Sequence, residues 1–188
     1  MISQIFDSSI FKVIALFALS PGSRFKRKEI KGKTKLNNVP LDRALERLLH
    51  SGIIKQEKGL YSVNHESKDA MQIISMAEAQ YKYFKNLPFD IYVILIDMAE
   101  EFSSTKNIEI WLFGSYAKLV YSDKSDIDIA FLAGDKKINK EKIKGKLKKI
   151  SEKYNKQIEE HIFPKKDFYR NKKDPLVKEI LQHGIRLV

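Results

Sequence analysis

The sequence predicts an α/β fold in two parts. Three observations predict it. Apolar residues recur at helical spacing through the N-terminal half of the chain. Two short strands about Lys58-Gly59 follow the first helices. Further on, an apolar strand at 108–113 ends at Gly114-Ser115, and a later strand carries an Asp-x-Asp pair. We therefore expect a helical N-terminal part with a hairpin, and a C-terminal part with a small mixed sheet backed by helices.

Composition limits the classes of protein that fit. The chain has 188 residues, no cysteine and a formal net charge of +11. No disulfide framework or thiolate metal site can be present, and the charge favours an anionic partner such as nucleic acid or a nucleotide. The apolar run at 11–19 contains Lys12 and is too short to span a membrane. We expect a soluble cytoplasmic protein.

The first 65 residues predict three helices and a hairpin. The first helix covers 1–20, where apolar residues recur at helical spacing, and Pro21-Gly22 ends it. A short helix fits 26–35. A third begins after the cap at Asn37 and Asn38 and ends near Gly52, a left-handed C-cap. The strands at 53–63 complete the part. The apolar residues of the first helix are Ile2, Ile5, Phe6, Ile10, Val13, Ile14 and Phe17.

This order of elements resembles the winged helix-turn-helix domain, over residues 1–65. The resemblance implies that the third helix enters the DNA major groove. This region holds twelve Lys and Arg against five Asp and Glu, a net charge of +7, which favours contact with phosphates. Winged helices also serve as protein-docking or dimerisation modules, and that alternative stays open. The candidate DNA-contacting residues are Lys26, Arg27, Lys28, Asn38, Arg43 and Arg47.

A linking helix is predicted at 66–87, with an apolar stripe that suits a core or a dimer seam. Asn86-Leu87-Pro88 breaks it, so we place a domain boundary there and a second domain at 88–188. Residues 89–102 are apolar at helical spacing and predict the helix that backs the sheet. Their Ile and Val content leaves a strand as the lesser alternative.

The stretch at 108–132 carries the chemistry. Gly114 permits a turn in which the backbone comes close to a ligand, and a short helix at 115–121 would offer free N–H groups to phosphate. In the next strand Asp126 and Asp128 share one face. Two neighbouring carboxylates suit a hard cation such as Mg²⁺. Either element alone could be a turn or a solvated strand edge; together they predict a nucleotide or metal site.

The remaining chain completes the sheet. A turn at 134–135 precedes a helix at 136–154, whose lysine-rich face suits either solvent or nucleic acid. A third strand follows at 157–163, then a basic turn at 165–170. A last helix begins at Asp174-Pro175, and Gly184 ends it before a short tail. The lysines of the predicted face are Lys136, Lys137, Lys140, Lys142, Lys144, Lys146, Lys148, Lys149 and Lys153.

Gly114-Ser115, ten further residues and Asp126-x-Asp128 resemble the signature of DNA polymerase β-like nucleotidyltransferases, most closely the small minimal ones, over residues 88–188. The family often has glycine where this chain has Leu119. The resemblance implies that Gly114 and Ser115 bind the triphosphate of an NTP, and that Asp126 and Asp128 bind Mg²⁺ or Mn²⁺. It implies transfer of an NMP to an acceptor hydroxyl, which in small relatives can lie on a toxin protein that the transferase silences.

The resemblance also implies a third carboxylate on the strand after the lysine-rich helix. The candidates are Glu159 and Glu160, and many winged-helix relatives lack this acid. Strand alternation puts Glu160 with Ile158 and Ile162, the core-facing set, so Glu159 is the one expected to face the site. His161 shares that face; it could stack on or bond near the nucleotide, but a lone histidine on a strand is more often structural.

A second function class remains open. The chain could be a DNA-binding regulator whose transferase-like domain only senses nucleotide. RNA end modification is a third interpretation, for which the chain is short. A homodimer is compatible with the DNA-binding interpretation, since winged-helix proteins often bind two half-sites.

Overall fold

The computed structural model describes residues 6–134 and 140–188. The predicted start of the first helix, including Ile2 and Ile5, and the predictions for Asp135, Lys136 and Lys137 lie outside these ranges. The chain divides into two compact units, one ending at Ile96 and the other running from Asp97 to Val188. The division falls inside α5 (Phe89–Glu101), after the boundary that the sequence suggests at residues 87 and 88.

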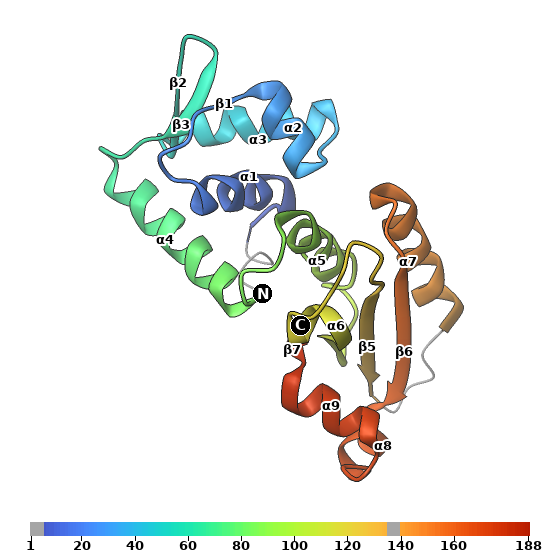
Figure 1. Cartoon of the computed structure of the whole chain (residues 1–188). Helices are drawn as coiled ribbons and strands as arrows, with labels where there is room; N and C mark the ends of the chain where they lie inside the picture. The colour runs from blue at the N-terminus through green and yellow to red at the C-terminus, as the bar shows by residue number, and fades with distance from the viewer. Residues whose placement is uncertain (1–5, 135–139) are drawn as a thin grey trace. The chain divides into compact units, whose positions relative to one another are not determined.

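The N-terminal unit combines helices with one small sheet (Figure 1). Its elements are α1 (Ser8–Leu19), β1 (Phe25–Lys26), α2 (Arg27–Thr34), α3 (Asn38–His50), β2 (Ile54–Glu57), β3 (Leu60–Val63), α4 (Lys68–Tyr83) and the first part of α5. The helices expected at 26–35 and 66–87 and the hairpin are present. The helix predicted at 89–102 is α5, so the strand alternative is wrong.

The sheet of this unit has the order β1-β3-β2, and both neighbours of β3 are antiparallel to it. The tip of the β2–β3 hairpin consists of Lys58 and Gly59, whose φ angles are 49° and 78°. Two successive positive φ angles are what a two-residue turn needs to match the twist of its strands. The sequence did not predict β1, because two residues show no periodicity.

The core of the N-terminal unit forms around α1. Phe11, Val13 and Phe17 are fully buried, and α1 packs against α2, α3 and α4. The helix begins at Ser8 because the Asp7 side chain accepts hydrogen bonds from the N–H groups of Ser9 and Ile10. Phe6 therefore precedes the helix, contrary to the expected start. No helix in the described parts of the chain has the length and apolar character needed to cross a membrane.

The C-terminal unit contains a mixed sheet (Figure 1). Its elements are the end of α5, β4 (Ile108–Phe113), α6 (Gly114–Lys118), β5 (Ile127–Ala133), α7 (Lys140–Tyr154), β6 (Ile158–Pro164), α8 (Lys165–Arg170), α9 (Pro175–His183) and β7 (Ile185–Arg186). The strand order is β6-β5-β4-β7. β5 and β6 are parallel and joined through α7, whereas β4 is antiparallel to both β5 and β7. The predicted α/β class, with a small mixed sheet backed by helices, is confirmed.

Two predicted segments differ from the structure. The basic turn at 165–170 is the short helix α8, held by the buried Phe168. The short tail after Gly184 contains an edge strand, in which Ile185 pairs with Leu112 and Arg186 with Trp111. Both depend on packing against elements that lie far away in sequence, which local periodicity does not report.

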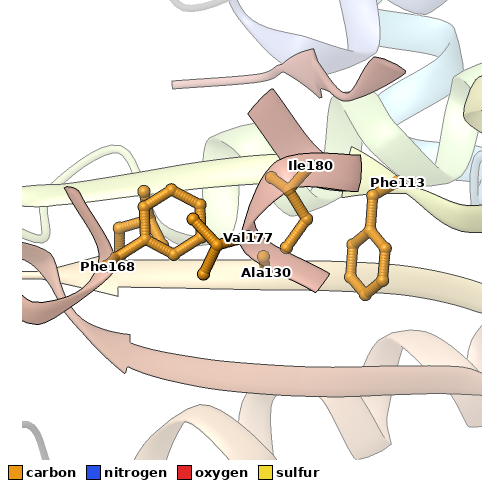
Figure 2. Packing of buried hydrophobic residues seen from close by; sticks show 6 residues of the cluster. Phe113, Ala130, Phe168, Val177 and Ile180 are labelled. Atoms are coloured by element: carbon orange, nitrogen blue, oxygen red, sulfur yellow. The ribbon is translucent and has the colours of Figure 1, made fainter. Parts of the chain in front are cut away.

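The two faces of the sheet differ in what covers them. On one face, Phe131 packs its ring 5.0 Å from that of Phe102, measured between centroids. On the other face, residues of β4 and β5 pack against α8 and α9, with Phe168 and Val177 over Ala130 (Figure 2). The alternation predicted for β5 is therefore present: Ile127, Ile129 and Phe131 face one way, and Asp128 faces the other. Asp128 lies on the same face of the sheet as Ala130, near the N-terminal end of β5.

The helix α7 buries Ile143, Leu147 and Ile150, as its periodicity predicts. Its lysines are not all simply solvated. Lys146 and Lys153 form ion pairs with Glu101 and Asp97 at the end of α5, at 3.2 Å and 2.7 Å. Tyr154 also donates a hydrogen bond to Asp97. These contacts fix α7 to the end of α5.

Candidate active site

A tight turn at Gly114 brings the end of β4 close to Asp128. Gly114 has a φ of 67°, in the left-handed region. A Cβ atom built on it would lie 1.9 Å from Oδ2 of Asp128. Glycine is needed here for two independent reasons, its backbone conformation and the space that the carboxylate occupies. The turn therefore presents backbone directly to an acidic side chain.

Asp128 lies between this turn and β6. In the sheet it pairs with Phe113 on β4 and with Glu159 on β6. Burial raises the pKa of Asp128, and the negative charges of Glu159 and Asp126 raise it further. His161 and a hydrogen bond from the Ser115 backbone N–H act in the opposite direction and lower the pKa. The ionised carboxylate is thus destabilised by its own neighbours, and a cation at this place would relieve the conflict.

Asp126 immediately precedes β5 and is partly buried. A hydrogen bond from the Ser122 backbone N–H to Oγ of Ser125, 2.8 Å long, shapes the loop before it. Lys156 donates to the carbonyl of Asp123 over 3.0 Å and connects the same loop to the start of β6. The loop is therefore held by a local hydrogen bond and by Lys156, and it places Asp126 directly before β5, at the end of the sheet at which Asp128 lies.

The two candidates for a third carboxylate face opposite sides of β6. Glu160 forms an ion pair with Lys144 of α7 at 3.4 Å. Glu159 lies beside Asp128, 56% of its side chain is exposed, and its Oε1 is 3.2 Å from Nε2 of His161. The ring of His161 in turn packs 5.2 Å from that of Phe113. Strand alternation therefore predicted correctly which glutamate faces Asp128, while its chemical role stays a prediction.

The donor set suits a hard divalent cation. Carboxylate oxygens are the ligands that Mg²⁺ prefers, and Mg²⁺ completes its shell with water and substrate phosphate. Within residues 6–134 and 140–188, no group of three or more His, Asp or Glu side chains converges closely enough to form a complete metal site. The two aspartates supply protein ligands of the right chemistry, and substrate would supply the rest. Glu159, with 56% of its side chain exposed, is not part of a preformed group of three ligands among the described residues.

Leu119 occupies the position at which the sequence departs from the family pattern. It has a φ of 59° and caps α6 in the left-handed conformation. The position thus requires the backbone that glycine adopts most easily. The side chains of Leu119, Val120 and Tyr121 are 50%, 71% and 37% exposed. The sequence predicted that these three residues continue the short helix at 115–121, but α6 ends at Lys118, so this part of the prediction is wrong.

Tyr121 stacks on Tyr116 of α6, with ring centroids 4.6 Å apart. Lys156 lies over the ring of Tyr116, 5.4 Å from its centroid. This stack joins the exposed run to the buried part of α6. The run is consequently fixed next to the Gly114 turn.

The residues predicted to contact DNA lie on α2 and α3 of the N-terminal unit and at the residue before α2. Lys26, Lys28, Arg43 and Arg47 are exposed. Arg27 is engaged with its neighbours: it donates two hydrogen bonds to Asp42, from Nε at 2.6 Å and from Nη2 at 2.8 Å. Its Nη2 also approaches Oδ1 of Asn38 at 3.4 Å. Arg27 and Asn38 thus differ from the four exposed cations in that they are hydrogen-bonded to each other.

Comparison with known proteins identifies the C-terminal half of the chain. A family model described as nucleotidyltransferase domain matches residues 94–187, which is half of the chain. No curated protein and no solved structure matches. The matched region contains Gly114, Asp126 and Asp128, the residues that the sheet brings to one end. From residue 94 onward this chain belongs to the nucleotidyltransferase domain family.

Proposed function

We propose that this nucleotidyltransferase is an enzyme that moves an NMP from an NTP to an acceptor hydroxyl. The reaction requires Mg²⁺, which Mn²⁺ can replace. The observation that carries the proposal is the place of Asp128, between the Gly114 turn and Glu159. Backbone groups, acidic ligands and a further carboxylate meet there at one end of the sheet. Phosphoryl transfer depends on such positioning and on neutralisation of charge.

Each residue has a distinct part in this proposal. The Gly114 turn lets the triphosphate approach the backbone, and Ser115 offers its hydroxyl to a phosphate oxygen. Asp126 and Asp128 hold the metal ion. When bound, the ion neutralises charge on the reacting phosphate and the leaving pyrophosphate. Glu159, beside Asp128, accepts the proton of the acceptor hydroxyl.

The electrostatics of Asp128 support the assignment. A carboxylate whose pKa is raised by burial and by two neighbouring acids is costly for an apo protein to keep ionised. Such clusters are more frequent at functional sites than elsewhere. A purely structural carboxylate would be expected to carry a compensating cation, as Glu109 of β4 does with Lys165.

We extend the proposal to the acceptor, which we take to be a hydroxyl on a partner protein, such as a toxin silenced by the transfer. The support is the exposed apolar run of Leu119, Val120 and Tyr121 next to the Gly114 turn. Single exposed apolar side chains are ordinary, but three consecutive ones are typical of a contact with another protein. A small-molecule or nucleic-acid acceptor would offer less apolar surface for contact with this run.

We further propose that the N-terminal unit is a winged helix that binds DNA, with docking to a protein as its alternative role. Three helices precede the β2–β3 hairpin, and β1, between α1 and α2, adds a third strand to its small sheet. The net charge of +7 over residues 1–65 supports a polyanionic partner. Lys28, Arg43 and Arg47 are exposed on α2 and α3 and would contact the duplex.

One experiment tests the catalytic proposal. The purified chain is incubated with Mg²⁺ and each NTP radiolabelled at the α-phosphate, alone and with a host cell extract. We expect label on a protein band, and we expect its loss with EDTA and in the variant D126N/D128N. Label that persists in that variant would refute the assignment of the aspartates.

The same experiment separates the alternative, a regulator that only senses nucleotide. Such a protein would bind Mg-NTP and transfer no label, and NTP would change its affinity for DNA. Binding is measured by calorimetry with a non-hydrolysable NTP. The size of a labelled band identifies the acceptor as the chain itself, a partner protein or nucleic acid.

A further inference from the structure

The Asp, Glu and Arg charges on the exposed face of α3 cancel. Two cations, Arg43 and Arg47, and two acids, Asp42 and Glu46, alternate along it. A helix with no net positive charge is a poor match for the phosphates that flank a groove. If α3 approaches DNA, at least one of the acids has to be neutralised by a residue from another element.

Arg27, at the start of α2, is placed to neutralise Asp42. Nε and Nη2 each donate to a different carboxylate oxygen, at 2.6 Å and 2.8 Å. This two-point arrangement fixes the guanidinium in a way that a single contact does not. The neighbouring Asn38 accepts a third, longer hydrogen bond from Nη2 at 3.4 Å. Arg27 therefore bridges two successive turns of α3.

Other charges around the pair agree with this arrangement. The hydrogen bonds from Arg27 are the chief cause that lowers the pKa of Asp42, and the charge of Lys31 on α2 acts in the same direction. In the comparable pair of Arg24, before β1, and Glu57 of β2, the closest nitrogen and oxygen are 3.6 Å apart, too far for a hydrogen bond as short as those of Arg27. Of these two ion pairs, only that of Arg27 has the geometry to hold one side chain in one orientation.

We propose that Arg27 is a positioning residue of the DNA-binding surface, which neutralises Asp42 and so leaves Arg43 and Arg47 as the cations that α3 presents to DNA. The inference rests on the proposed binding of DNA by this unit. It assigns Arg27 a role other than direct contact with phosphate. The partner is duplex DNA, whose phosphates would otherwise be repelled by the Asp42 carboxylate.

The test is a double-mutant cycle on the full chain with Arg27→Gln and Asp42→Asn. Binding to a fluorescein-labelled random-sequence DNA duplex is followed by anisotropy over a series of salt concentrations. Arg27→Gln leaves Asp42 unpaired and should weaken binding about tenfold at low salt. In the double variant the acid is gone as well, so affinity should return to within about twofold of the wild type with the same salt dependence.

A direct phosphate contact gives a different result. The double variant would then stay as weak as Arg27→Gln, and the slope of log affinity against log salt would fall by about 0.9 for the lost contact. That result would overturn the inference. A merely structural role for the pair would lower the melting temperature of both single variants without this pattern of rescue, and it would overturn the inference too.

Lys28 gives the matched control. It is an exposed cation one residue away from Arg27 on α2. Lys28→Gln should weaken binding by the same factor with or without Asp42→Asn, so its coupling to Asp42 should be absent. Equal coupling of Lys28 and Arg27 to Asp42 would show only a general charge effect and would overturn the inference. A wild-type chain with no salt-dependent binding to the duplex would refute the DNA-binding proposal itself.

Discussion

Gly114 and Asp128 lie so close together that a single added Cβ atom on the glycine would be 1.9 Å from the aspartate Oδ2. The turn also holds Gly114 at a φ of 67°, where a residue with a Cβ would be strained in addition. The turn and the acidic strand are consequently one structural unit. A change to either residue is expected to displace the other.

The first prediction concerns Gly114→Ala. The left-handed backbone alone costs about 1–2 kcal/mol for a residue with a Cβ, and the contact with Asp128 adds to that cost. We expect a lower melting temperature and loss of transfer activity, measured by thermal unfolding and by the label assay. Gly145→Ala is the control: nothing lies within 4 Å of its Cβ, and alanine inside α7 should stabilise the chain by about 0.5–1 kcal/mol. Equal destabilisation by both variants would contradict the prediction.

The second prediction concerns the apo protein and Asp128→Asn. The pKa of Asp128 is raised by burial and by Glu159 and Asp126, so the native state binds this proton more tightly than the unfolded state does. Its contribution to stability therefore falls as pH rises from the unfolded pKa of about 3.9 through the raised native one. Asp128→Asn should thus raise the melting temperature of the metal-free protein at neutral pH, and less so at about pH 4, while it abolishes transfer.

Melting curves of the metal-free wild type and variant over this range of pH give the measurement. Asp123→Asn, at an exposed site on the loop before Asp126, is the control. A variant that is less stable than the wild type at neutral pH would contradict the expected sign. It would mean that the hydrogen bond from the Ser115 N–H outweighs the repulsion.

The third prediction separates Glu159 from Glu160. Glu159→Gln removes the carboxylate beside Asp128, and loss of a general base typically costs about 10²-fold or more in kcat. Glu160→Gln only breaks a contact with Lys144 on the other face of β6 and should change kcat little. Steady-state kinetics of both variants decide the matter. Unchanged kcat in Glu159→Gln would show that the site works with two carboxylates.

The fourth prediction is that Leu119→Gly is more stable than Leu119→Ala. Both variants lose the half-buried leucine side chain, worth about 0.8–1.5 kcal/mol, so that loss cancels in the comparison. Relief of the left-handed strain is worth about 1–2 kcal/mol, and the greater freedom of glycine in the unfolded chain takes back about 0.4–1 kcal/mol. We expect Leu119→Gly to exceed Leu119→Ala by about 0.5–1 kcal/mol in chemical denaturation. At Val120, without a positive φ to relieve, the order should reverse, and Val120→Gly should be less stable than Val120→Ala.

The course of β5 and β6 could be predicted because alternation along a strand is local. It assigned Asp128 and Glu159 to one face and Glu160 to the other, and the register of the two strands agrees. The segments distant in sequence that pair with a strand or pack against it could not be predicted in this way. The run at 108–113 looked wholly apolar apart from Glu109, which is only 5% exposed.

Glu109 is buried, and most of the partners of its carboxylate lie far away in sequence. Lys165 of α8 forms an ion pair with it. Tyr169 donates a hydrogen bond over 2.7 Å and Trp111 another over 3.3 Å. The contacts with Lys165 and Tyr169 exist only because α8 is a helix and is folded onto the sheet. Because this packing depends on residues far away in sequence, local sequence reasoning predicted a basic turn at 165–170 instead of the helix α8.

The parallel pairing of β5 with β6 has a consequence for how the site comes into being. Asp128 and Glu159 meet only after the chain has closed the crossover through α7, which is a slow, nonlocal step in folding. No partly folded chain that lacks β6 can present both carboxylates. A ligand that engages both carboxylates should therefore slow the hydrogen exchange of those β5 and β6 amides that exchange only when the two strands separate, and not that of the loops alone.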